Sequence, residues 1–118
     1  MDSSFRRGDV RYARLPNVGG SVQYGFRPIL ILSNEKGCLN SPIIICSPLT
    51  SKQKKKMPTH VEIKRGGGLS KDSVLLLEQI LTVDRNCIET KLLTRLPNDM
   101  MFVVDKAISV SLGMDIAS

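Results

Sequence analysis

The sequence predicts a mainly β protein with one helix: a small, bent antiparallel sheet or barrel with a packed C-terminal helix. Two observations carry this prediction. Short branched and aliphatic runs recur along the chain between turn residues, which is typical of antiparallel strands. From Met100 to Leu112 the apolar residues change to helical spacing, which indicates an amphipathic helix. With 118 residues and no evident linker or repeat, residues 1–118 are expected to form a single domain.

A glycine-rich loop organises the first half of the chain. Residues 15–26 contain a proline and three glycines, and a loop of this length in a compact domain tends to be functional. Because Pro28 disfavours helical geometry in the residue before it, Arg27 is expected to be extended and to begin a strand. We expect one strand before the loop, one after it, and a third that pairs antiparallel with the second: residues 7–14, 27–33 and 41–47.

The remaining connections are short and rich in turn residues. Residues 34–37 indicate a turn, and residues 65–68, with three consecutive glycines, indicate a flexible connection. Residues 74–77 fit a helix or a strand by period alone, and a strand is favoured because glycines precede them. We therefore expect three further strands, the first of them at an edge of the sheet: residues 60–64, 73–84 and 91–95.

The C-terminal helix has the clearest start signal in the chain. Pro97 is followed by Asn98 and Asp99, either of which can cap the free amides of a helix. Gly113 can end the helix, and its apolar face is expected to cover the sheet.

Composition narrows the class of protein. Seventeen Lys and Arg against eleven Asp and Glu leave a net charge of +6, which favours polyanionic partners such as RNA, DNA or an acidic protein. Aromatic residues are only 4%, which counts against a protein that reads single strands mainly by stacking. Cys38, Cys46 and Cys87 fit no paired spacing, so reduced thiols in a cytoplasmic protein are expected. No apolar run reaches membrane-spanning length.

The reactive side chains exclude several catalytic classes. His60 is the only histidine, so one chain cannot use one histidine as acid and another as base, and a structural role is expected for it. The carboxylates are scattered, so neither a metal site nor a cofactor is expected. What remains is Arg27 before one strand, Thr50 after its neighbour, and a lysine-rich loop. Such a pair suits phosphoryl chemistry on RNA, whose own 2′-hydroxyl is the nucleophile.

Segments spread over nearly the whole chain together resemble the MazF/PemK toxin family, in the family's order and at its spacing. They are Arg7-Gly8-Asp9-Val10, Gly20-Ser21-Val22-Gln23, Gly25-Phe26-Arg27-Pro28, Ser33-Asn34, Pro48-Leu49-Thr50, Pro58-Thr59-His60-Val61-Glu62-Ile63 and residues 69–80.

This resemblance implies an SH3-like barrel of the MazF/PemK-CcdB type and a homodimer. It also implies a bacterial toxin that cleaves single-stranded mRNA at short sequence motifs without metal, leaving a 5′-hydroxyl and a 2′,3′-cyclic or 3′-phosphate. The family's catalytic arginine and threonine fall on Arg27 and Thr50. The implied partner is a cognate antitoxin with an acidic, disordered C-terminal segment.

Polar residues around this pair are expected to contact RNA. Glu78 and Gln79 interrupt an aliphatic run, where burial is costly unless they face a groove or find partners. Gln23 can contact a base edge or bond its own loop, and the lysines attract the RNA backbone. The expected RNA-binding residues are Ser21, Gln23, Lys52, Lys54, Lys56, Glu78 and Gln79.

One departure from the family leaves alternatives open. Val22 stands where many relatives carry a glutamate, which predicts a slower enzyme or a different base preference. A non-enzymatic toxin that poisons DNA gyrase is one alternative, because such toxins share the implied fold. An inactive relative that only binds an antitoxin is the other.

Overall fold

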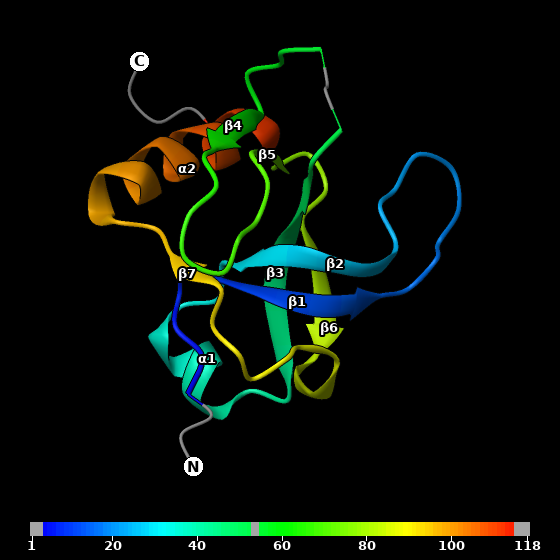
Figure 1. Cartoon of the computed structure of the whole chain (residues 1–118), viewed down its shortest axis with the longest axis vertical. Coiled ribbons are helices and arrows are strands. Elements are labelled where there is room, and N and C mark those ends of the chain that lie inside the picture. The colour runs from blue at the N-terminus through cyan, green and yellow to red at the C-terminus, as the bar shows by residue number, and fades with distance from the viewer. Residues whose placement is uncertain (1–3, 53–54, 115–118) are drawn as a thin grey trace.

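A computed structural model describes residues 4–52 and 55–114 (Figure 1). Its seven strands form one curved antiparallel sheet in the order β4-β5-β3-β2-β1-β7, with β6 also paired to β3. The mainly β fold with a C-terminal helix is therefore confirmed. The elements are β1 (Asp9–Leu15), β2 (Gly25–Ile31), α1 (Glu35–Asn40), β3 (Ile43–Thr50), β4 (His60–Ile63), β5 (Ser73–Leu76), β6 (Leu81–Asp84), a 3-10 turn (Arg85–Cys87), β7 (Thr94–Arg95) and α2 (Asn98–Ser111).

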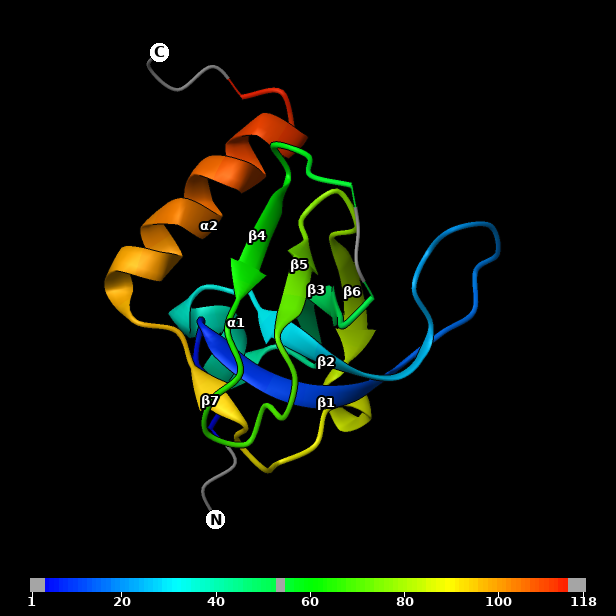
Figure 2. The same ribbon diagram turned by 45° about the horizontal axis from the view of Figure 1, so that its top comes forward.

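Strand β3 organises the sheet because it pairs with three other strands. Its first half pairs with β6 from Ile43 to Cys46, and its last two residues, Leu49 and Thr50, pair with β5. Along its other edge it pairs with β2, as expected from the sequence. Strand β6 pairs with the first half of β3 and β5 with its last two residues, and the sheet curls between these two pairings (Figure 2).

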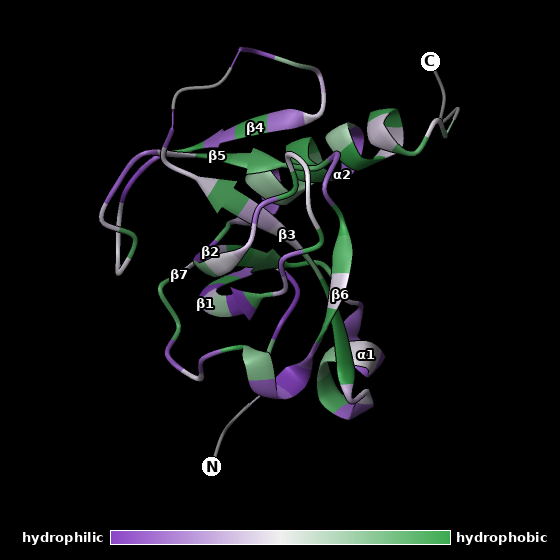
Figure 3. Ribbon diagram, turned by 90° about the vertical axis from the view of Figure 1, so that its right-hand side faces the viewer, coloured by the Kyte–Doolittle hydropathy of each residue, from purple (hydrophilic) through white to green (hydrophobic). Residues whose placement is uncertain are grey.

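The core consists of two clusters on the two faces of this curled sheet. Alternation along β1 and β2 sends Val10 and Leu30 into one cluster and Ala13 and Ile29 into the other. The first cluster also contains residues of α2, and the second contains Cys38 of α1. Figure 1 shows the two helices at opposite ends of the sheet, and Figure 3 shows the hydrophobic residues along β3, β5 and β6.

One predicted element was wrong, and one predicted strand is interrupted. Residues 34–37 form no isolated turn: Asn34 caps α1, its side chain accepting a hydrogen bond from Gly37 N. Burial of Cys38 on this helix explains why the segment continues beyond one turn. Residues 73–84 form two strands, β5 and β6, which both pair antiparallel with β3 and therefore run in the same direction. An interruption at residues 77–80 separates them, and the sequence prediction placed its two polar residues, Glu78 and Gln79, within one strand.

The C-terminal helix begins and ends close to its predicted limits. Pro97 occupies the N-cap position without a side-chain cap, so neither Asn98 nor Asp99 serves as the expected cap residue. Asp99 instead accepts a hydrogen bond from Met100 N in the first turn. Gly113, with φ of +69°, follows the helix as expected. Within the described ranges, no helix is long and apolar enough to span a membrane.

The connection between β1 and β2 projects away from the sheet (Figures 1 and 2). Gly19 and Gly20 in this loop have positive φ, and a Cβ atom at either would meet no atom within 4 Å. The loop therefore has conformational freedom that other residues must restrict.

Candidate active site

The register of β2 and β3 brings Arg27 and Thr50 to the same end of the sheet. Ile29 lies opposite Pro48 and Leu30 opposite Ser47. The paired residues end at Ile29 and Pro48, two residues from Arg27 and two from Thr50. Because side chains alternate along a strand, Arg27 and Thr50 are expected to face the same side of the sheet as this pair.

The guanidinium of Arg27 is held by the end of the loop that precedes it. Its Nε atom donates a hydrogen bond of 2.7 Å to the carbonyl oxygen of Tyr24. Gly25, with φ of +85°, lets the chain fold back for this contact. The two Nη groups make no hydrogen bond or ion pair with any residue in the described ranges. They are therefore available to an anionic oxygen of a substrate.

Thr50 ends β3 with only 2% of its surface exposed. Its Oγ1 accepts a hydrogen bond of 3.2 Å from Lys52 N, and the hydroxyl keeps its own proton for a further partner.

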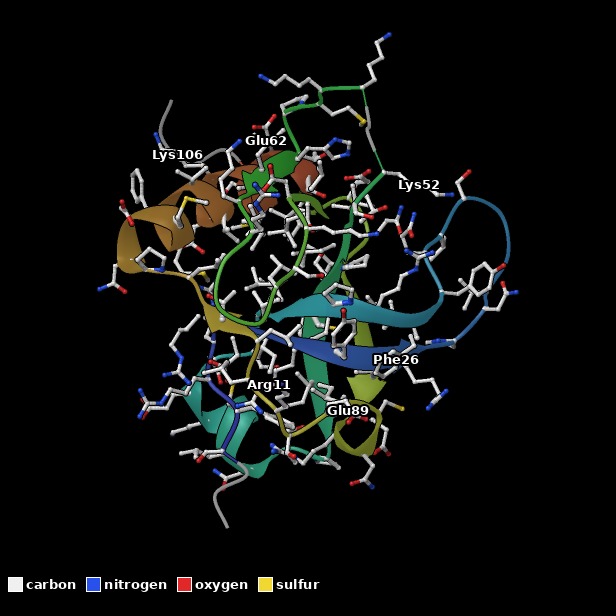
Figure 4. The ribbon with its side chains drawn as sticks, in the orientation of Figure 1. Arg11, Phe26, Lys52, Glu62, Glu89 and Lys106 are labelled. Carbon is white, nitrogen blue, oxygen red and sulfur yellow. The ribbon has the colours of Figure 1, made fainter. Side chains whose placement is uncertain are left out.

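Lys52 is exposed where β3 leaves the sheet, as Figure 4 shows, and lines a cleft of 320 Å³ beside Ser51. Lys56 is also exposed on this connection, whereas Lys54 lies outside the described residues.

Glu78 lies in the turn between β5 and β6 rather than within a strand. Its Oε1 accepts a hydrogen bond from Thr59 Oγ1, and its Oε2 pairs with His60 Nε2, each at 3.0 Å. Burial alone would raise the pKa of Glu78, but the hydrogen bonds from His60 and Thr59 outweigh it and lower that pKa. The carboxylate is therefore ionised and occupied by protein partners, and His60 has a structural hydrogen bond.

Gln79 joins the same turn to the β1–β2 loop. Its Oε1 accepts a hydrogen bond of 2.8 Å from Gln23 N, and its Nε2 donates one of 3.4 Å to the carbonyl oxygen of Ser21. The structure therefore brings Ser21, Gln23 and Gln79 together. Gln23 and Gln79 also line a cleft of 410 Å³, whose other lining residues are Pro16, Val18, Val22, Pro48, Glu78, Ile80, Leu81 and Thr82.

Two features were missed in the sequence. Ser47 is fully buried in β3, and its hydroxyl donates to the carbonyl oxygens of Leu76 and Gln79. A serine within an apolar strand was the available signal, because a buried hydroxyl needs a partner.

The rings of Tyr12 and Phe26 stack 4.8 Å apart and 5° from parallel, and Phe26 is 52% exposed. Although aromatic residues are few, these two form one stacked pair, and Phe26 directly precedes Arg27 in the sequence.

The cysteines take no part in this arrangement. Burial raises the pKa of Cys46 to about 12 and also raises that of Cys38, so both thiols stay protonated and unreactive. Across residues 4–52 and 55–114, no three side chains of His, Cys, Asp or Glu are grouped as a metal-ligand set.

Comparisons with known proteins identify relatives of nearly the whole chain. Residues 6–112 match the family described as PemK-like, MazF-like toxin of type II toxin-antitoxin system. The curated Endoribonuclease MazF of Staphylococcus saprophyticus is 48% identical over 111 residues, which cover 92% of each chain.

Solved structures share the fold. MazF from Deinococcus radiodurans superposes with a TM-score of 0.80 at 25% identity, covering 96% of this chain and 100% of that one. An endoribonuclease in complex with its cognate antitoxin, from Mycobacterial species, has a TM-score of 0.76 at 21% identity and covers 96% of this chain and 99% of that one. Because the family match spans residues 6–112 and the curated relative is 48% identical, the chain belongs to the PemK-like, MazF-like toxins of type II toxin–antitoxin systems.

Proposed function

We propose that this toxin is an endoribonuclease that cuts single-stranded mRNA at short sequence motifs without a metal ion, using Arg27 and Thr50. The observation that supports the proposal is the β2–β3 register, whose last printed pair, Ile29 and Pro48, lies two residues from both Arg27 and Thr50. Among the described residues, the Nη groups of Arg27 have no hydrogen-bond partner. The 48% identity to an endoribonuclease MazF supports the same reaction class.

The proposed reaction takes its nucleophile from the substrate. The 2′-hydroxyl loses its proton and attacks the adjacent phosphorus, the bond to the 5′-oxygen breaks, and that oxygen gains a proton. The products are a 2′,3′-cyclic phosphate, which water can open to a 3′-phosphate, and a 5′-hydroxyl. Arg27 stabilises the charge of the phosphorane, since a group with a pKa above about 12 is a poor base. The Thr50 hydroxyl positions a phosphate oxygen by hydrogen bonding.

Substrate binding is proposed to use the loops around this pair. Lys52, Lys54 and Lys56 attract the RNA backbone, and Ser21 and Gln23 approach its bases. Support comes from the exposure of Lys52 and Lys56 and from the place of Gln23 in the wall of the 410 Å³ cleft. Glu78 and Gln79 are also proposed as RNA contacts, because both line this cleft while their side chains bond to the protein as well.

Two protein partners are proposed. An antitoxin with an acidic, disordered C-terminal segment suits the net charge of +6. A second copy of the chain suits an apolar surface at the start of β3, where Ile43 and Ile45 are 52% and 42% exposed and follow the 57% exposed Leu39 of α1. Burial of such residues between two copies is typical of homodimers.

Cleavage of a long single-stranded RNA in EDTA, with mapping of the 5′ ends, tests the reaction. Wild-type protein is expected to cut at a recurring short motif, and Arg27→Ala and Thr50→Val are each expected to lose about 100-fold or more in rate. Thr50→Val keeps the shape of the buried side chain and removes only the hydroxyl. Arg65→Ala, which removes an exposed arginine elsewhere, is the matched control and should cut within about threefold of wild type.

Other outcomes have equally definite meanings. Wild-type protein that leaves a diverse RNA intact would favour a gyrase poison or an inactive antitoxin-binding relative. Cleavage that persists in both variants would overturn the assignment of Arg27 and Thr50.

A further inference from the structure

The β1–β2 loop, residues 16–24, is tied to the rest of the sheet by one distant side chain. Gln79 bonds Gln23 N at 2.8 Å and the Ser21 carbonyl oxygen at 3.4 Å across more than fifty residues of sequence. Within the described ranges, the loop's other hydrogen bonds are local, from Gly19 N to Asn17 Oδ1 and from Arg27 Nε to the Tyr24 carbonyl oxygen. Gln79 is therefore what restricts the middle of the loop.

The turn that carries Gln79 is itself fixed by buried groups. Gln79 N donates to the carbonyl oxygen of Leu76 at 3.0 Å. The buried Ser47 hydroxyl donates to the carbonyl oxygens of Leu76 and Gln79, at 2.6 and 3.3 Å. Glu78, the neighbour of Gln79, is held by Thr59 and His60. The side chain of Gln79 thus extends from a rigid support to a loop that is flexible by composition.

These contacts form a short path to the proposed catalytic arginine. Gln79 fixes Gln23, whose next residue, Tyr24, accepts the hydrogen bond from Arg27 Nε. A displacement of Gln23 therefore moves the carbonyl group that orients the Arg27 guanidinium. The path consists of two hydrogen bonds, at 2.8 and 2.7 Å, and one covalent step along the backbone.

The same contacts leave one polar atom of Gln23 without a partner. Gln23 Oε1 is buried and makes no hydrogen bond to any described residue, although Gln23 lines the 410 Å³ cleft. A buried acceptor without a donor is costly, and that cost is recovered when a ligand supplies the donor. An amino or imino group on a base edge has this chemistry.

We infer that Gln79 is a positioning residue, which holds the β1–β2 loop so that Arg27 is oriented for catalysis and Gln23 is presented to a base. The expected effect of Gln79 on the rate rests on the proposed RNA cleavage. The expected effect of Gln79 on the loop does not. Gln79 itself touches no reacting atom, which distinguishes this role from the direct RNA contact expected from the sequence.

Amide hydrogen exchange of the RNA-free protein tests the contact with the loop. In Gln79→Leu the Gln23 amide is expected to exchange about tenfold faster than in wild type, with no change at Leu30 in β2. Gln79→Glu keeps an acceptor for Gln23 N but no donor for Ser21, so its exchange rate should be intermediate. Thr82→Ala, which shortens another side chain of the same cleft wall, should leave the Gln23 exchange rate unchanged.

Steady-state cleavage of an RNA oligonucleotide then tests positioning against binding. Gln79→Leu is expected to lower kcat by about 10- to 100-fold with less than about a threefold change in KM, and Gln79→Glu should recover part of kcat. Unchanged Gln23 exchange, or faster exchange with unchanged kcat, would overturn the inference, as would a loss confined to KM. Faster Gln23 exchange in a protein whose wild type cuts no RNA would support the loop contact and refute the proposed function.

Discussion

At the scale of single residues, the Arg7-Gly8-Asp9 triplet has a structural role that depends on Asp9. This carboxylate is fully buried at the first position of β1. Its Oδ2 accepts hydrogen bonds from Arg6 N and from Nε and Nη2 of Arg11, at 3.0, 3.1 and 2.9 Å, and its Oδ1 accepts one of 2.7 Å from Arg95 Nε. One side chain therefore joins the N-terminal segment, β1 and β7.

Asp9→Asn is expected to lower the free energy of unfolding by about 3 kcal/mol, because it leaves the buried Arg11 guanidinium without its counter-charge. Asp105→Asn is the matched control: Asp105 pairs with Arg7 at 2.7 Å on the surface, and its loss should change stability by less than about 1 kcal/mol. Urea denaturation of both variants measures the difference. Equal effects of the two substitutions would refute the structural role of Asp9.

At the scale of elements, the connection of residues 65–68 is more restricted than its three glycines predict. Gly66 and Leu69 exchange backbone hydrogen bonds, and Gly68 N donates to the Leu93 carbonyl oxygen at 2.6 Å. Gly67 has φ of +56°, and a Cβ atom there would lie 2.6 Å from the same Leu93 oxygen. Glycine is therefore required at this position by both backbone conformation and close packing.

Gly67→Ala is expected to destabilise the protein by about 2 kcal/mol or more, since the backbone strain and the contact with Leu93 add. Gly66→Ala is its matched control, because a Cβ atom at Gly66 meets nothing within 4 Å, and it should stay within about 1 kcal/mol of wild type. Thermal unfolding followed by circular dichroism compares the two. A Gly67→Ala protein as stable as Gly66→Ala would contradict this account of the connection.

At the scale of the whole molecule, positive charge is expected to govern the encounter with RNA. The net charge of +6 belongs to the whole chain, but exposed lysines are concentrated in the connection between β3 and β4, next to Thr50. Charges that contact phosphates release counterions on binding, so they make affinity depend on salt without specifying sequence.

The double variant Lys52→Gln, Lys56→Gln is expected to bind single-stranded RNA more weakly and to reduce the slope of log Kd against log salt by up to about 1.4. Its cleavage motif should not change. Lys36→Gln, Lys106→Gln removes the same charge from α1 and α2 and should leave the slope nearly unaltered. Fluorescence anisotropy over a salt series separates the two cases, and equal slopes in both double variants would show that only net charge matters.

Several elements could be predicted from short stretches of sequence alone. Alternation predicted β1 and β4, Pro28 predicted an extended Arg27, and apolar periodicity predicted α2. The pairing of the second and third predicted strands was enough to expect Arg27 and Thr50 at one end of the sheet. The resemblance to the toxin family required no tertiary structure, because its segments keep their order and spacing along the chain.

The tertiary structure was needed to find the protein partners of Glu78 and Gln79. From the sequence, both residues were placed within one strand, so the interruption at residues 77–80 was not foreseen. At that interruption both side chains have protein partners: His60 and Thr59 for Glu78, and the β1–β2 loop for Gln79. The physical reason is that hydrogen-bond partners distant in sequence are set by how β3 pairs with β5 and β6, and no local pattern of residues encodes that pairing.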